Sequence, residues 1–350
     1  MNILKLQRIQ FFLYKLGYNK ISKINEIKLG INSKIYKIEI GKKNIILKLY
    51  CDKKRLRIKR EFKFYNYLAK IKSKNVAKLI AINLEENFAL YTFLNGKRVK
   101  KINENHIYLA SRFINQINKY KKKSKLPLAV DGIESRIDHL RLCARKINQM
   151  KLVKKNSFID KNFFLFLQTK IIPTFNRIKK NLLKENIFKG LEYKLIRSQM
   201  IISPSDFGFH NIIESNNRIF FYDFEYAGLD DPIKLLCDFY CQPDQKINKE
   251  KKEIFKRNIL SKYKSFEKID FMVKKFLPLH QLKWCCIILN VFQEDKMKLR
   301  NNATKARKDV LQRQLIKARN IASQETTTKK LKTDMFIAER RSSRSGLVKY

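Results

Sequence analysis

Apolar residues alternate with polar ones between Lys23 and Tyr50, and this region is rich in β-branched side chains. Gly30 and Gly41 interrupt it at two points, where turns are expected. The pattern predicts three short antiparallel strands. From Lys53 the chain loses glycine and proline, and its apolar residues recur close to the helical period, which predicts a helix packed on the sheet.

Strand character returns at VAKLIAIN and NFALYTFL, after which Asn95-Gly96 predicts a turn. From Ile102 to about Phe188 the pattern is mostly helical. Strands are expected again around Ile201 and in RIFFYDFEY, and the chain beyond Asp231-Pro232 is helical. The predicted class is α+β, with an N-terminal lobe over residues 1–94, a mostly helical lobe over 95–322, and a loosely ordered basic tail over 323–350.

The chain carries 78 Lys and Arg against 31 Asp and Glu, which gives a formal net charge of +47. Such an excess suggests nucleic acid or an anionic membrane surface as a partner. It also fits a genome rich in A and T, because Lys, Ile and Asn dominate together and the basic residues are spread along the chain. We therefore do not expect nucleic acid to be the main partner.

Other features of the composition favour a protein of the reducing cytoplasm. The six cysteines form no CxxC pair, and we expect all of them to be small buried thiols. The first sixteen residues make a poor signal peptide. No apolar run approaches the ~20 residues that a membrane-spanning helix needs.

The segment SPSDFGFHN contains the most informative polar cluster. Asp206 and Asn211 stand in the relation D-x-x-x-x-N, and Asp223 follows in D-F-E after a short strand. A hairpin turned at residues 215–217 would bring Asn211 and Asp223 to one end of a ribbon, where their oxygens suit Mg²⁺. Along the chain, the order of these three residues is the one found in kinases, where a catalytic Asp is followed by two metal ligands. The alternative is a turn in which Asp and Asn only cap backbone amides.

Lys48 lies among apolar residues on a strand that is expected to be central, where an unpaired charge would be costly. The carboxylate best placed to pair with it is Glu61, on the helix that follows. Such a pair would direct Lys48 toward the phosphates of a nucleotide. The alternative is that Lys48 extends outward from an edge strand.

Two further segments are candidates for nucleotide contacts. The turn around Gly30, Asn32 and Ser33 would cover the phosphates with its backbone amides. The segment YTFLNG, with Tyr91 and Phe93, would be a hinge whose backbone reads adenine, or else an ordinary loop.

Taken together, these motifs resemble the aminoglycoside phosphotransferase and choline kinase family over residues 24–290. The resemblance implies a bilobal protein-kinase-like fold and an ATP- and Mg²⁺-dependent transfer of phosphate to a small molecule. It implies that Asp206 is the catalytic base or orients the acceptor, that Asn211 and Asp223 bind metal, and that Lys48 anchors phosphate. It also implies that Asp238 braces the catalytic loop.

Two features qualify this resemblance and bear on the function. The family's His, two residues before the catalytic Asp, is replaced by Pro204, which leaves open a catalytically weak nucleotide-binding scaffold. A basic nucleic-acid-binding protein is a further alternative.

Only seven residues separate Asp223 from Asp231-Pro232, which leaves no room for the peptide-binding segment of protein kinases. The acceptor is therefore expected to be a small hydroxylated molecule.

Overall fold

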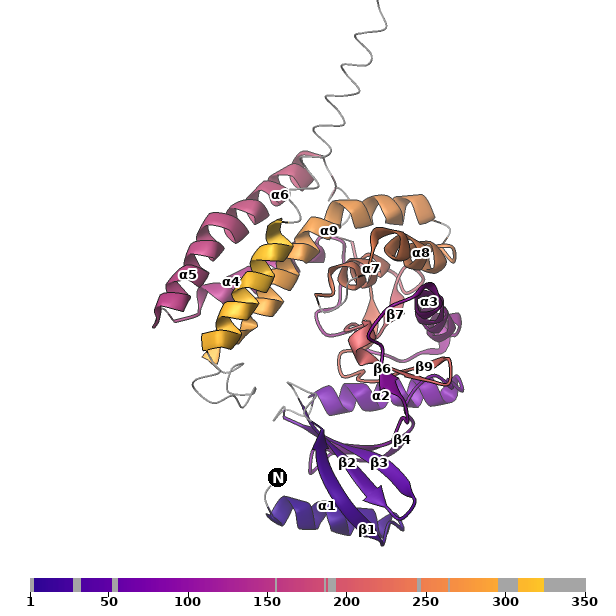
Figure 1. Ribbon diagram of the computed structural model, residues 1–350. Helices are drawn as coiled ribbons and strands as arrows, with labels where there is room; N and C mark the ends of the chain where they lie inside the picture. The colour runs from indigo at the N-terminus through magenta and orange to yellow at the C-terminus, as the bar shows by residue number, and fades with distance from the viewer. Residues whose placement is uncertain are drawn as a thin grey trace, which may run out of the picture. The chain divides into compact units, whose positions relative to one another are not determined.

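The computed structural model describes residues 3–27, 33–51, 56–154, 156–185, 187, 193–243, 247–263, 265–294 and 308–323. The chain forms two compact units (Figure 1). The first comprises Met1–Gly132, Met200–Asp230 and Ile247–Lys262, and the second comprises Ile133–Gln199, Asp231–Lys246 and Tyr263–Tyr350. Gly30, Asn32 and most of the predicted tail lie outside the described residues.

The first unit begins with helix α1 (Ile3–Lys15) and a five-stranded antiparallel sheet of order β1-β2-β3-β5-β4. The strands are β1 (Ile21–Ile27), β2 (Ser33–Ile40), β3 (Lys43–Tyr50), β4 (Leu79–Asn83) and β5 (Phe88–Thr92). The three strands predicted between Lys23 and Tyr50 are confirmed. Gly41, with φ of 56°, supplies the left-handed conformation in the two-residue turn between β2 and β3.

The two faces of this sheet have different neighbours because successive side chains of a strand point to opposite sides. Ile45 and Leu47 of β3 share a buried cluster with Ile9 and Leu13 of α1. The side chain of Lys48 lies on the other face of β3. It points toward helix α2 (Leu56–Lys70), whose Glu61 contacts it. Helix α1 therefore covers one face, and α2 packs on the other (Figure 1).

The remainder of the first unit carries the predicted hairpin. Strands β8 (Ile212–Ser215) and β9 (Arg218–Phe221) pair around a turn at Asn216 and Asn217. The other elements are β6 (Lys97–Arg98), α3 (Glu104–Lys119), η1 (Lys121–Lys123), β7 (Ile201–Ser203), η3 (Phe209–Asn211), β10 (Gly228–Asp230) and α8 (Lys249–Leu260). Stacked aromatic rings hold this region, with Phe113 and Phe221 at 4.1 Å between centroids.

The described part of the second unit is helical, as the sequence predicts. Helix α9 packs against α7, α4 and α6. The elements are α4 (Asp138–Lys151), α5 (Phe158–Phe166), η2 (Leu167–Ile171), α6 (Ile172–Lys184), α7 (Pro232–Cys241), α9 (Phe266–Leu289), η4 (Asn290–Phe292) and a helix over residues 308–323. None of the described helices is long and apolar enough to cross a membrane.

The cysteines differ in one respect from the expectation. All six are free thiols, and five of them are buried. Cys51 is exposed, so the expectation of a buried thiol is wrong there. It follows the last residue of β3, where the chain leaves the sheet.

Candidate functional site

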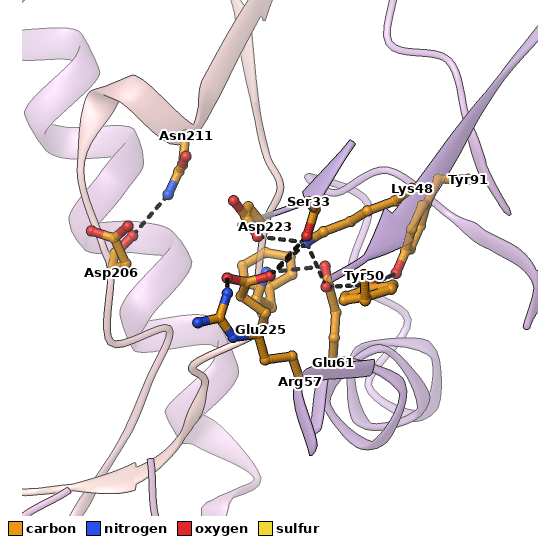
Figure 2. Close-up of polar contacts among 11 residues, drawn as sticks. Ser33, Lys48, Tyr50, Arg57, Glu61, Tyr91, Asp206, Asn211, Asp223 and Glu225 are labelled. Carbon is orange, nitrogen blue, oxygen red and sulfur yellow. Dashed lines mark hydrogen bonds and ion pairs between the residues drawn. The ribbon is translucent and has the colours of Figure 1, made fainter. Parts of the chain in front are cut away.

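Lys48 lies at the centre of the site in the first unit. Its Nζ atom is 2.7 Å from Glu61 Oε2 and 2.6 Å from Asp223 Oδ1 (Figure 2). The residue is only 5% exposed, and β3 is the central strand of its sheet. The alternative of a lysine extending outward from an edge strand is therefore wrong, and the expected pair with Glu61 is confirmed.

Glu61 is fixed by a network on its other side. Its Oε2 atom accepts a hydrogen bond from the Tyr50 hydroxyl at 2.5 Å, and its Oε1 atom accepts one from the Phe224 amide at 3.2 Å. The hydroxyls of Tyr50 and Tyr91 are 2.9 Å apart. Because buried polar groups cost free energy unless they are hydrogen-bonded, this network holds the carboxylate in one position.

Charge and burial act against each other in this cluster. Burial by itself would lower the pKa of Lys48, but the carboxylates of Asp223, Glu61 and Glu225 outweigh it and raise that pKa well above its usual value. Burial also raises the pKa of Glu61, and Lys48 opposes that rise. We conclude that Lys48 remains a cation surrounded by anionic oxygens.

Glu225 is a residue of this cluster that the sequence interpretation missed. It is buried, and its carboxylate lies 3.4 Å from Lys48 Nζ, 3.2 Å from Arg57 Nη1 and 3.4 Å from Ser33 Oγ. It lies two residues after Asp223, but strand periodicity does not mark it, because Asp223 has a φ of 65° and the chain turns at Glu225. Ser33, a predicted nucleotide contact, is therefore linked to the site by its contact with Glu225.

The predicted catalytic loop lies beside this cluster. Asn211 donates from Nδ2 to the backbone oxygen of Asp206 at 3.1 Å (Figure 2). His210 Nε2 is 3.4 Å from the Asp206 carboxylate. The backbone amide of Tyr222 donates to Asn211 at 3.2 Å, which places Asp223 at the same end of the hairpin as Asn211. The predicted geometry of the hairpin is confirmed.

The oxygens around Lys48 and Asn211 fit a divalent cation. Carboxylate oxygens of Glu61, Asp223 and Glu225 all lie within 4.8 Å of one another. The amide nitrogen of Asn211 is used as a donor, so its Oδ1 is the atom left to act as a ligand. Hard cations such as Mg²⁺ prefer such ligands. Lys48 sets one positive charge against these three carboxylates, and Arg57 adds a second through Glu225.

A cavity of about 320 Å³ connects these groups. The side chains of Ile35, Ile46 and Ile213 line its apolar part, and Lys48, Asp206 and Asp223 are among its polar lining. Its volume lies in the range of small-molecule sites.

The predicted hinge also lines this cavity, from Tyr91 through Leu94. The backbone amides and carbonyls of this segment are the groups that would pair with a planar heterocycle. Of the predicted site residues, the structure brings together Ser33, Lys48, Glu61, Tyr91, Phe93, Asp206, Asn211 and Asp223.

No protein-family model matches the chain, and no curated protein matches it in sequence. Solved structures match it over most of its length. The aminoglycoside phosphotransferase APH(2'')-Ib bound to ADP is 14% identical, with 92% of this chain and 99% of that one covered and a TM-score of 0.55. A spectinomycin phosphotransferase, APH(9)-Ia, with ADP and spectinomycin is 13% identical, with 90% and 97% covered and a TM-score of 0.61.

The choline kinase LicA from Streptococcus pneumoniae is 14% identical, with 90% of this chain and 98% of that one covered and a TM-score of 0.57. These proteins come from the family that the motifs resemble. The likeness confirms the predicted α+β, protein-kinase-like fold.

Proposed function

We propose that the protein is a phosphotransferase that moves the γ-phosphate of ATP to a hydroxyl group of a small molecule. Asp206 orients the acceptor hydroxyl and accepts its proton as the hydroxyl oxygen bonds to phosphorus and the bond to ADP breaks. Lys48 binds the α- and β-phosphates, and Glu61 positions Lys48. The hinge peptide groups at Phe93 and Leu94 bind adenine.

A single observation carries this proposal. The Lys48 ammonium is held by Glu61 and Asp223 in the lining of a cavity that Asp206 and Asn211 also line. Phosphoryl transfer needs little covalent chemistry but needs positioning and charge stabilisation. A buried cation, a carboxylate and two oxygen ligands around one cavity supply both.

Asn211 and Asp223 would hold Mg²⁺, and Glu225 lies close enough to contribute. The cation would neutralise the charge of the phosphates and keep them in place. The nucleotide phosphates would take the place of Asp223 beside Lys48, and the Asp223 carboxylate would then be available to hold the cation.

For the acceptor we propose a neutral or anionic, sugar-like alcohol. The similar structures include enzymes named for spectinomycin, choline and ethanolamine, so the fold accommodates diverse acceptors. A cationic acceptor would require a pocket rich in carboxylates, and this chain is poor in acids. We place the activity in the cytoplasm, where ATP is available and free thiols stay reduced.

The test is ADP production from Mg-ATP with panels of sugars, amino alcohols and aminoglycosides. Wild type is expected to turn over with at least one acceptor, and Asp206→Asn to lose at least about a hundredfold in kcat. Asp309→Asn, a change of the same kind at an exposed helical position, should retain full activity. Binding of Mg-ATP without transfer to any acceptor would instead identify a nucleotide-binding scaffold, the alternative that Pro204 raises.

A further inference from the structure

Helix α1 has a second apolar face that the sheet does not cover. Its buried residues are Ile9 and Leu13. On the other side, Ile3 is 77%, Leu4 58%, Phe11 60% and Tyr14 64% exposed. These four residues lie within about one third of the helix circumference, since an α-helix turns about 100° per residue. We call them the outer face of α1.

This outer face departs from the usual surface helix, which turns charged and polar side chains to water. Single exposed apolar residues are ordinary, but four of them on one side of a helix, with the uncharged Gln7 among them, indicate a site of interaction. The outer face is not needed for the packing of α1, because Ile9 and Leu13 already anchor the helix in the sheet's core. It can therefore bind a partner without unfolding the unit.

Two basic residues, Arg8 and Lys15, border the outer face, and helix α1 contains no acidic residue. The Lys15 ammonium lies 4.5 Å from the centroid of the Phe11 ring, so a cation sits directly against the apolar patch. Arg8 pairs with Glu86 at 2.6 Å, an exposed ion pair that water and salt weaken.

We propose that the outer face of α1 binds an anionic lipid surface, with the helix lying in the plane of the interface. Aromatic and aliphatic side chains beside lysines are the composition that such helices use. A second copy of this chain would bring a like charge of +47, which opposes association. Nucleic acid would satisfy the cations but would give the four apolar side chains no apolar phase to enter. This inference does not depend on the proposed phosphotransfer.

The experiment is co-sedimentation of the full chain with two kinds of vesicle, pure phosphatidylcholine and phosphatidylcholine mixed with phosphatidylglycerol. We expect binding to the mixed vesicles that weakens with salt, and little binding to the neutral ones. The variant Leu4→Ser/Phe11→Ser should lose about tenfold or more in partition coefficient, because it removes apolar area that would enter the bilayer.

The matched control is Phe158→Ser/Leu165→Ser on α5, where the two side chains are 77% and 56% exposed. This variant should bind like wild type. All substituted positions are exposed, and equal melting temperatures would show that each protein is folded. The variant Lys15→Gln keeps the apolar face and should weaken binding to the mixed vesicles only.

Three outcomes would overturn the proposal. The first is no binding of wild type to the mixed vesicles. The second is equal binding of wild type and Leu4→Ser/Phe11→Ser, which would assign binding to the overall charge. The third is self-association of wild type that the same variant abolishes, which would assign the outer face to a second copy of the chain.

Discussion

The position of the Lys48 ammonium depends on groups from three parts of the first unit. Glu61 comes from α2, Asp223 from the segment after β9, and Tyr50 reaches Glu61 from the end of β3. The buried Glu61 and Lys48 would each be costly to bury alone. Their opposite charges, with that of the half-buried Asp223, lower this cost, so substitution of any one affects the position of the others.

Replacing Glu61 with glutamine should therefore impair the proposed activity without removing the cavity. The amide keeps the size of the side chain but loses the charge that holds Lys48. We expect a decrease of about 10- to 100-fold in kcat/KM for ATP, the scale expected when a positioned group is misplaced by a small distance. Steady-state kinetics at saturating acceptor would measure it.

A matched control for this prediction is Glu250→Gln in the first turn of α8, where the side chain is exposed. It should leave kcat/KM unchanged. If the Glu61→Gln protein had the same kcat/KM for ATP as wild type, Lys48 would not need its ion pair with Glu61 for the reaction.

At the scale of elements, α7 and α9 of the second unit are joined by a buried polar network. The Asp238 carboxylate of α7 accepts a hydrogen bond from Trp284 Nε1 at 2.9 Å and contacts Lys283, Lys234 and His280. Burial alone would raise the pKa of Asp238, but Lys283 and Lys234 hold it well below its usual value. The role of Asp238 as a brace of the catalytic loop stays a prediction.

Replacing Asp238 with alanine should be strongly destabilising, because it leaves two buried ammonium groups without their common carboxylate. The expected loss is about 3–5 kcal/mol in the free energy of unfolding at neutral pH. Equilibrium unfolding in guanidinium chloride would measure it. Asp309→Ala, at an exposed position, should cost little; similar losses in both variants would contradict the account of the network.

His280 should make stability depend on pH. Its Nδ1 lies 3.2 Å from Asp238 and its Nε2 2.9 Å from His139 Nδ1. Burial, with a contribution from Lys283, lowers the pKa of His280 to about 3. The unfolded chain, with a pKa of about 6.5, takes up a proton that the folded chain does not. Stability from this group is therefore complete above about pH 6.5 and falls as the pH falls toward 3.

Between pH 7 and pH 5 this difference corresponds to about 2 kcal/mol of unfolding free energy. Wild type should lose that much more than His280→Gln over the same interval. Parallel losses in the two proteins would show that His280 is protonated in the folded state.

The sequence predicted those contacts that depend on nearby residues or on strand periodicity. Lys48 and Glu61 are 13 residues apart on a strand and the next helix, and Asn211 and Asp223 lie on one hairpin. By contrast, His139 and His280 are 141 residues apart, and no local pattern reveals that they meet. Glu225 was missed for the same reason, because its neighbours Arg57 and Ser33 come from distant segments.

At the scale of the whole molecule, the arrangement of the motifs in the fold is a better indicator of function than the net charge. The net charge of +47 is distributed along the chain, whereas the proposed site concentrates three carboxylates around one lysine. The described chain places all the proposed nucleotide contacts within the first unit. Mg-ATP binding should therefore stabilise that unit directly.

Thermal unfolding with and without Mg-ATP tests the central claim most directly. At about 100 times its dissociation constant, a ligand adds about 2.7 kcal/mol to the stability of the state that binds it. We predict such stabilisation of wild type and its absence in Asp223→Asn, with Asp309→Asn behaving as wild type. No shift in wild type, or the same shift in Asp223→Asn, would contradict the assignment of this cavity as a Mg-nucleotide site.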